Sequence, residues 1–130
     1  MTPSPFAAFS LFAAAALAAP AALAAPQSAP TFPAEFHGRW DLSTEHCQRD
    51  ESGSALTISA RQIVGYEDTS TLKSARILDG GSLHVFVDNE SSEGDREIQM
   101  VMWRSSEGGE WLNIEGDSRP QAVRYARCGA

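Results

Sequence analysis

Apolar and polar residues alternate with a period of two from Phe36 onward, and clusters of turn-forming residues interrupt the alternation at short intervals. Leu83, Val85 and Val87, for example, are separated by single residues and are followed by the polar stretch 89–95. This alternation predicts half-buried strands, and the Gly, Asp, Asn and Ser clusters between the runs predict turns. The pattern predicts about eight short strands, at 39–42, 56–59, 62–67, 72–78, 83–87, 97–105, 111–114 and 123–127.

The spacing of these strands favours one architecture. Successive runs are separated by the few residues that a hairpin needs, and the apolar positions of this region show no helical repeat. An antiparallel meander removes its exposed edges when it closes on itself. We therefore predict an all-β domain, either a small antiparallel barrel of about eight strands or a sandwich.

Residues 1–25 have the character of a signal peptide. The run 6–19 is apolar apart from Ser10, and small alanines follow it, so we expect cleavage after Ala24 or Ala25. No lysine or arginine precedes the run, which departs from the usual pattern. The alternative is an uncleaved anchor, but alanine inserts weakly and prolines interrupt the stretch. We expect a periplasmic or secreted protein without stable membrane insertion.

The exported part divides into an arm and one domain. Residues 26–35 are rich in proline, which predicts a flexible, extended arm. Residues 36–130 then form a single disulfide-closed domain, because about 100 residues support one modest core. We expect a monomer.

The chain contains two cysteines, Cys47 and Cys128, which bracket almost all of the predicted strands. The first and last strands of a closed meander are neighbours, and disulfides persist in exported proteins, so we predict that these two cysteines are bonded. The alternative is a reactive or metal-binding thiol beside His46. One histidine and one cysteine are too few ligands for a structural zinc site.

Charge and composition exclude several functions. The net charge of −7 disfavours nucleic acid and anionic lipid as partners. The acidic stretch 88–95 does not have the spacing of a calcium-binding EF-hand loop, so we expect no metal and no cofactor. The histidines are His37, His46 and His84, and no serine lies in a nucleophile-elbow motif. We do not expect an enzyme; the alternative is a small hydrolase with an unrecognised site around His84.

Gly38 and Trp40 on the first predicted strand, with an arginine late in the chain, resemble the lipocalin-type barrel. The resemblance implies that the tryptophan closes one end of the barrel and that an arginine of the last strand packs over its ring. Arg124 and Arg127 are the candidates for that arginine. Guanidinium over indole gives a favourable cation–π contact, and a glycine allows close approach.

Two other groups of proteins share features with the two ends of the domain. The segment 38–43, followed by His46 and Cys47, is similar to the opening of the small periplasmic inhibitors of secreted metalloproteases, which are eight-stranded barrels with one disulfide. Their second cysteine comes much earlier than Cys128, so the connectivity differs. The Phe-x-Gly-x-Trp start and the Arg/Cys end also resemble a group of uncharacterised exported proteobacterial proteins.

The stretch 97–104 carries apolar residues on both faces of a predicted strand. Ile98, Met100 and Met102 are expected in the core, which leaves two further apolar residues outside, beside two aromatic residues of the preceding strand. The candidate partner-binding surface therefore consists of His84, Phe86, Val101 and Trp103. The alternative is that Phe32 or Phe36 of the N-terminal arm covers these residues.

These observations favour a non-catalytic, exported binding or inhibitory barrel. The expected partner is another exported protein, such as a protease, or a small apolar ligand. The alternative is an accessory protein of the cell envelope that acts through a protein partner. A deep apolar pocket favours the small ligand, whereas a flat exposed patch favours the protein partner.

Overall fold

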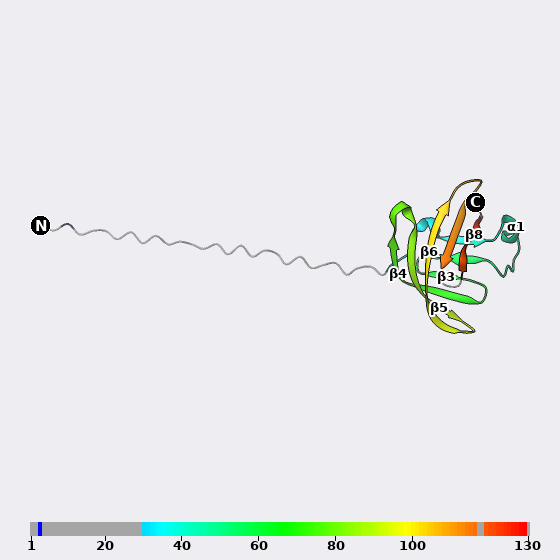
Figure 1. Cartoon of the computed structure of the whole chain (residues 1–130), viewed down its shortest axis with the longest axis horizontal. Helices are drawn as coiled ribbons and strands as arrows, with labels where there is room; N and C mark the ends of the chain where they lie inside the picture. Colours follow the sequence, from blue (N-terminus) through cyan, green and yellow to red (C-terminus); the bar gives the residue numbers. More distant parts are fainter. Residues whose placement is uncertain (1–2, 4–29, 117–118, 130) are drawn as a thin grey trace.

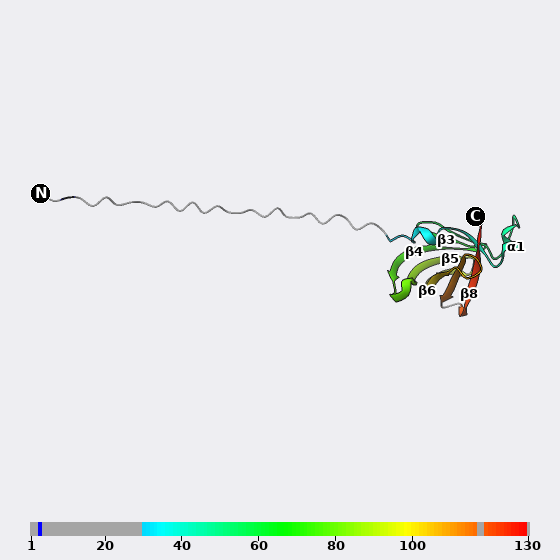
Figure 2. The same cartoon turned by 90° about the horizontal axis from the view of Figure 1, so that it is seen from above.

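The computed structural model describes Pro3 and residues 30–116 and 119–129, which form an eight-stranded closed antiparallel barrel (Figure 1). Each strand pairs with the next along the chain, and the last strand pairs with the first. Figure 2 shows the barrel from above. The predicted all-β barrel is confirmed, and the sandwich is not observed. The predicted signal peptide, apart from Pro3, and the first part of the arm lie outside the described residues. The strands are β1 (Gly38–Asp41), β2 (Leu56–Ile58), β3 (Gln62–Val64), β4 (Asp68–Ile77), β5 (Leu83–Ser91), β6 (Gly94–Ser105), β7 (Trp111–Gly116) and β8 (Arg119–Cys128).

Three short helical turns lie between or before the strands. They are the 3-10 turns η1 (Ala34–Phe36) and η2 (Asp79–Gly81) and the single α-helical turn α1 (Thr44–Cys47). The hydroxyl of Ser43 caps α1 by accepting a hydrogen bond from the backbone N–H of His46 at 3.3 Å. The described part of the domain is otherwise built from strands and loops.

The hairpin of β5 and β6 is longer than the polar stretch 89–95 predicted. The two strands stay paired from Leu83 with Met102 to Ser91 with Gly94, so strand pairing extends through most of that stretch. The expectation that this stretch forms a turn was wrong because most of its polar residues are exposed at the rim of the barrel, where a strand can be polar, and the inward Asn89 is hydrogen-bonded. The glycine at the tip, Gly94, has a φ of 117°, which few other residues tolerate.

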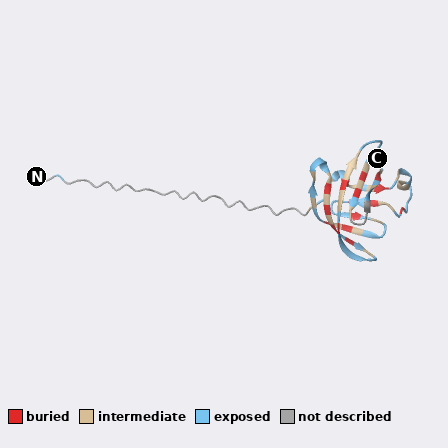
Figure 3. Cartoon of the chain, in the orientation of Figure 1, coloured by how far each residue is buried: buried red, intermediate tan, exposed pale blue. Residues whose placement is uncertain are grey.

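Buried residues recur along the strands of the barrel, as the alternation predicts (Figure 3). Leu83, Val85 and Val87 of β5 are buried, and so are Ile98 and Met102 of β6. Met100 is half-buried and packs against the same core, whose buried members also include Phe32, Phe36, Trp40, Leu56, Ile58, Ile63, Leu72, Leu112, Ile114 and Tyr125.

One end of the barrel is closed by the N-terminal segment. Trp40 is completely buried, and its indole Nε1 donates a hydrogen bond of 2.9 Å to the carbonyl oxygen of Phe36 in η1. Phe32 and Phe36 lie in the core beside it. The alternative that either phenylalanine covers the outer surface of β5 and β6 is therefore wrong, because their burial in the barrel removes more apolar area from water.

Arginines hold this closed end together. The guanidinium of Arg127 lies over the Trp40 ring, with 4.1 Å between its Cζ atom and the ring centroid, and donates to the carbonyl oxygens of Glu35 and His37 at 2.7 and 2.8 Å. Arg124, the other candidate, stacks on Trp111 at 3.7 Å instead. Of the two candidates, Arg127 therefore lies over the indole, because Trp40 pairs with Arg127 across the two strands and Arg124 faces the other side of β8.

The predicted disulfide is confirmed. Cys47 at the end of α1 is bonded to Cys128 at the end of β8, with 5.2 Å between their Cα atoms. Since Cys128 pairs with Arg39 of β1, the bond lies at the seam where the first and last strands meet. It therefore ties α1 to the seam that closes the barrel.

Candidate functional site

The end of the barrel opposite Trp40 is open. It forms a funnel with a volume of about 950 Å³, lined by residues of the segments 42 and 53–56, 65–68, 89–96 and 123–125. A second cavity of about 280 Å³ lies deeper, and the two share the lining residues Leu56, Asp68, Asn89 and Arg96. The open end is therefore a continuous passage from solvent into the barrel.

The deep cavity has an apolar wall. Ile63, Ile98 and Ile114 are buried and come from three different strands, β3, β6 and β7, while Met100 is half-buried beside them. Gly116 completes this wall at the point where β7 and β8 shift register. A side chain at this position would meet the backbone of β6, so the glycine lets the two strands approach.

A polar cluster lies where the cavity meets the funnel. The side-chain nitrogen of Asn89 donates to the carboxylate Oδ2 of Asp68 and to the hydroxyl oxygen of Ser70, each at 2.9 Å. Asn89 and Ser70 are both 5% exposed. Because the register pairs Ser70 with Asn89 and Asn89 with Arg96, three adjacent strands carry polar side chains inward at the same level.

Gly65 fixes the position of Asp68. The backbone N–H of Gly65 donates to the carbonyl oxygen of Asp68 at 2.9 Å, which closes the tight turn between β3 and β4. A Cβ atom at Gly65 would collide with Oδ1 of Asp68, so a larger residue at this position would displace the carboxylate from its observed place. The turn therefore positions the carboxylate at the edge of the funnel.

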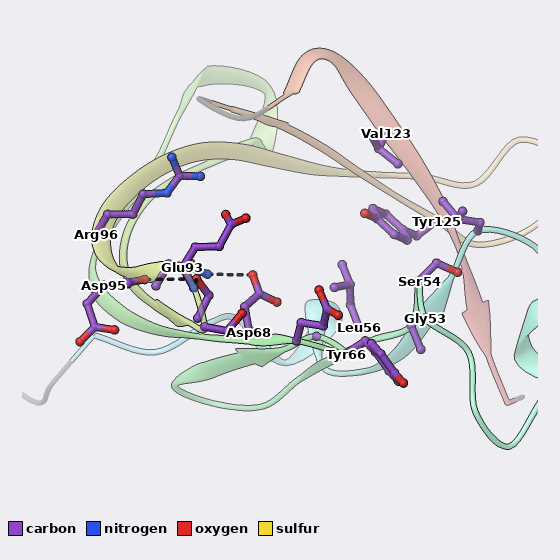
Figure 4. Close-up of a pocket in the computed structure, with 18 residues that line it drawn as sticks. Gly53, Ser54, Leu56, Tyr66, Asp68, Glu93, Asp95, Arg96, Val123 and Tyr125 are labelled. Carbon is purple, nitrogen blue, oxygen red and sulfur yellow. Dashed lines mark hydrogen bonds between the residues drawn. The ribbon is translucent and has the colours of Figure 1, made fainter.

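Charged side chains surround the opening (Figure 4). The carboxylates of Asp68 and Glu93 and the guanidinium of Arg96 project into it, whereas the carboxylate of Asp95 points away. Arg96 already takes part in an interaction within the protein. The phenol of Tyr125, whose residue is 5% exposed, faces the same space from β8.

The four residues of the predicted partner-binding surface lie together on the outer face of β5 and β6. His84 pairs with Val101 across the two strands, and its ring lies 4.9 Å from that of Phe86. Its Nε2 atom is 3.3 Å from the side-chain oxygen of Gln99. Trp103 follows on the same face of β6, and all four residues are half-buried. They form an outer surface that is separate from the open end.

A buried carboxylate, Asp41, has a structural role. Its Oδ1 accepts hydrogen bonds from the hydroxyl of Ser54 at 2.5 Å and from the backbone N–H of Leu42 at 2.8 Å. Burial raises the pKa of Asp41, but the hydroxyls of Ser54 and Ser52, the N–H of Leu42 and the charge of His46 outweigh it and lower that pKa overall. Asp41 therefore anchors the loop before β2 to the end of β1.

His37 and His46 lie in structural settings. Nδ1 of His46 is 2.7 Å from the hydroxyl of Ser43, which caps α1, and Nε2 of His37 is 2.8 Å from the carbonyl oxygen of Phe32.

Among residues 30–116 and 119–129, no three His, Cys, Asp or Glu side chains are grouped so that they could hold a metal ion. In the same part of the chain, no helix is long and apolar enough to cross a membrane.

The open end was not predicted from the sequence, although a signal for it was present. Asn89 continues the inward series of Leu83, Val85 and Val87, and Ser70 precedes the inward Leu72 by two positions. A polar residue that continues an apolar inward series marks the level at which a barrel becomes accessible to water.

The sequence matches no protein-family model, no curated protein and no solved structure.

Proposed function

We propose that this protein is a non-catalytic, exported binding protein that takes a small ligand into the open end of its barrel. The observation that supports it most directly is the cavity of about 280 Å³, with an apolar wall and a polar cluster at its entrance. Small-molecule sites combine these features, and their volumes begin at about 300 Å³. The closed end gives the cavity a floor, because the buried ring of Trp40 packs in the core with Phe32 and Phe36.

The disulfide supports an exported, periplasmic or secreted location. Disulfides persist in oxidising compartments and are rare in reducing ones. The bond between Cys47 and Cys128 spans most of the domain, as expected for a small domain that is stabilised covalently outside the cytoplasm.

A fragment titration followed by amide chemical shifts tests the proposal. A panel of small amphipathic compounds should shift the amide signals of Ser70, Asn89 and Ile98 more than those of the outer face. Met100→Phe fills the cavity and should abolish these shifts. Val101→Phe is the matched control, because it adds the same ring at the next position, on the opposite face of β6. Shifts that survive in Met100→Phe would contradict the proposal.

The outer surface made by His84, Phe86, Val101 and Trp103 supports a second candidate function, binding or inhibition of another exported protein. The supporting observation is the position of four half-buried side chains, two of them large aromatics, on one outer face. Aromatic residues of this kind often anchor partners. A protein partner should be retained by Met100→Phe and lost by Trp103→Ala, the reverse of the result expected for a small ligand.

A further inference from the structure

Apart from the guanidinium of Arg96 and the hydroxyl of Ser70, the polar side chains that line the entrance of the deep cavity, Asp68 and Asn89, present acceptors. A side-chain amide has two N–H donors, and Asn89 uses both of them on Asp68 and Ser70. The nitrogen must face Asp68, because a carboxylate accepts hydrogen bonds and does not donate them. Asn89 therefore offers its carbonyl oxygen, and Asp68 offers its carboxylate, to a molecule that enters the cavity.

Negative charge exceeds positive charge in the same opening. Asp68 and Glu93 both direct carboxylates into it, against the guanidinium of Arg96 (Figure 4). Arg96 is already engaged within the chain. The protein as a whole carries a charge of −7, which also attracts cations toward an opening lined with carboxylates.

We propose that the ligand of the open end is a small organic cation, an amine with a compact apolar body. Its ammonium group lies between the carboxylates of Asp68 and Glu93, and its apolar body lies against Ile98 and Ile114. Ammonium–carboxylate hydrogen bonds are stronger than neutral ones, and the apolar wall adds a hydrophobic contribution. This inference depends on the proposed function, since it names the chemistry of the ligand in that site.

Three probes with a common phenyl group separate the possibilities: 2-phenylethylammonium, 2-phenylethanol and 3-phenylpropionate. They are titrated into the oxidised protein at low salt, and amide chemical shifts report both the affinity and the place of binding. We expect 2-phenylethylammonium to bind at the open end about tenfold more tightly than 2-phenylethanol, and 3-phenylpropionate to bind most weakly. Binding of the ammonium compound should also weaken as salt is added.

Variants of the two carboxylates test the assigned contacts. Asp68→Asn should weaken binding of 2-phenylethylammonium about tenfold and leave that of 2-phenylethanol nearly unchanged. Glu93→Gln should weaken binding of the ammonium compound about two- to fivefold. Both carboxylates belong to exposed residues, but that of Asp68 is held in place by the side chain of Asn89, whereas Glu93 lies at the tip of the hairpin. Asp95→Asn is the matched control, since it removes one negative charge from the same hairpin while its carboxylate points away from the opening. Glu93→Gln keeps the test valid if Asp68→Asn fails to fold.

Two results would overturn the inference, and they have different consequences. If 2-phenylethanol or 3-phenylpropionate binds at the open end as tightly as the ammonium compound, the preference for cations is wrong and the proposed function stands. If none of the three probes shifts the signals of the open end, both the inference and the proposed function fail. Equal effects of Glu93→Gln and Asp95→Asn would show that general charge, rather than the assigned contact, determines binding, and would overturn the placement of the ammonium group.

Discussion

Arg127→Met is expected to weaken the closed end of the barrel severely. The guanidinium of Arg127 donates two hydrogen bonds to the backbone of the N-terminal segment, forms an ion pair of 2.6 Å with Glu110, and lies over the Trp40 ring. Methionine keeps some apolar contact with the indole and loses the charge and the donors. The carbonyl oxygens of Glu35 and His37 then lose this donor.

The magnitude follows from these contacts. Each hydrogen bond contributes about 1 kcal/mol net, the cation–π contact about 1 kcal/mol, and the ion pair with the half-exposed Glu110 between about 0 and 1 kcal/mol. Arg127→Met should therefore lower the free energy of unfolding by roughly 3 kcal/mol. For a domain of this size, that corresponds to a decrease in Tm of about 12–24 °C.

Arg124→Met provides the matched control. Arg124 also stacks on a tryptophan, Trp111, and donates to the carbonyl oxygen of Glu107 at 3.3 Å, but it lies on the outer face and is exposed. Its loss should cost about 0.5–1 kcal/mol. Urea unfolding of both variants, followed by far-ultraviolet circular dichroism, gives the comparison. If the two variants lose equal stability, Arg127 does not hold the closed end and the reasoning is refuted.

Replacement of both Cys47 and Cys128 by serine should lower the free energy of unfolding by about 4.5 kcal/mol, because the bond joins residues 81 positions apart; an unchanged urea midpoint would contradict this. Asp41→Asn should cost about 1–3 kcal/mol at neutral pH. The pKa of Asp41 is lowered from 3.8 in the folded state, so the contribution of Asp41 to the free energy of unfolding is complete above about pH 4 and is lost as the pH falls through the lower, folded-state pKa. In a plot of the urea midpoint against pH, Asp41→Asn should therefore reduce the slope at acid pH. Gly116→Ala should cost about 1–3 kcal/mol by calorimetry, because the new Cβ would lie 2.6 Å from a backbone oxygen of β6, whereas Gly53→Ala meets no atom within 4 Å and should be nearly neutral.

The barrel was predictable because its core follows strict alternation. Leu83, Val85 and Val87 face inward, and Met102 lies directly opposite Leu83, as the period of two requires. Alternation fixes the face on which a side chain lies once one member of the strand is known to be buried. It also explains why Arg127, and not Arg124, lies over Trp40, since Arg127 is two residues from the buried Tyr125 and Arg124 is one residue from it.

The open end was less predictable because it depends on polar residues that face inward. Asn89 and Asp68 are far apart in the sequence, and both appear among residues typical of turns. Only the pairing of β4 with β5 along their whole length brings these side chains together. The shape of the cavity depends further on Gly116, whose close approach to β6 has no local sequence signal.

The segment before β1 and the segment after β8 both lie at the closed end of the barrel. The chain enters through η1, which Arg127 binds, and it leaves after Cys128, which pairs with the start of β1. A purification tag, fusion partner or solid support attached at either terminus therefore leaves the open end accessible to solvent. A chip that carries the protein through its N-terminal arm would therefore leave the opening unobstructed, and an added C-terminal segment would do the same.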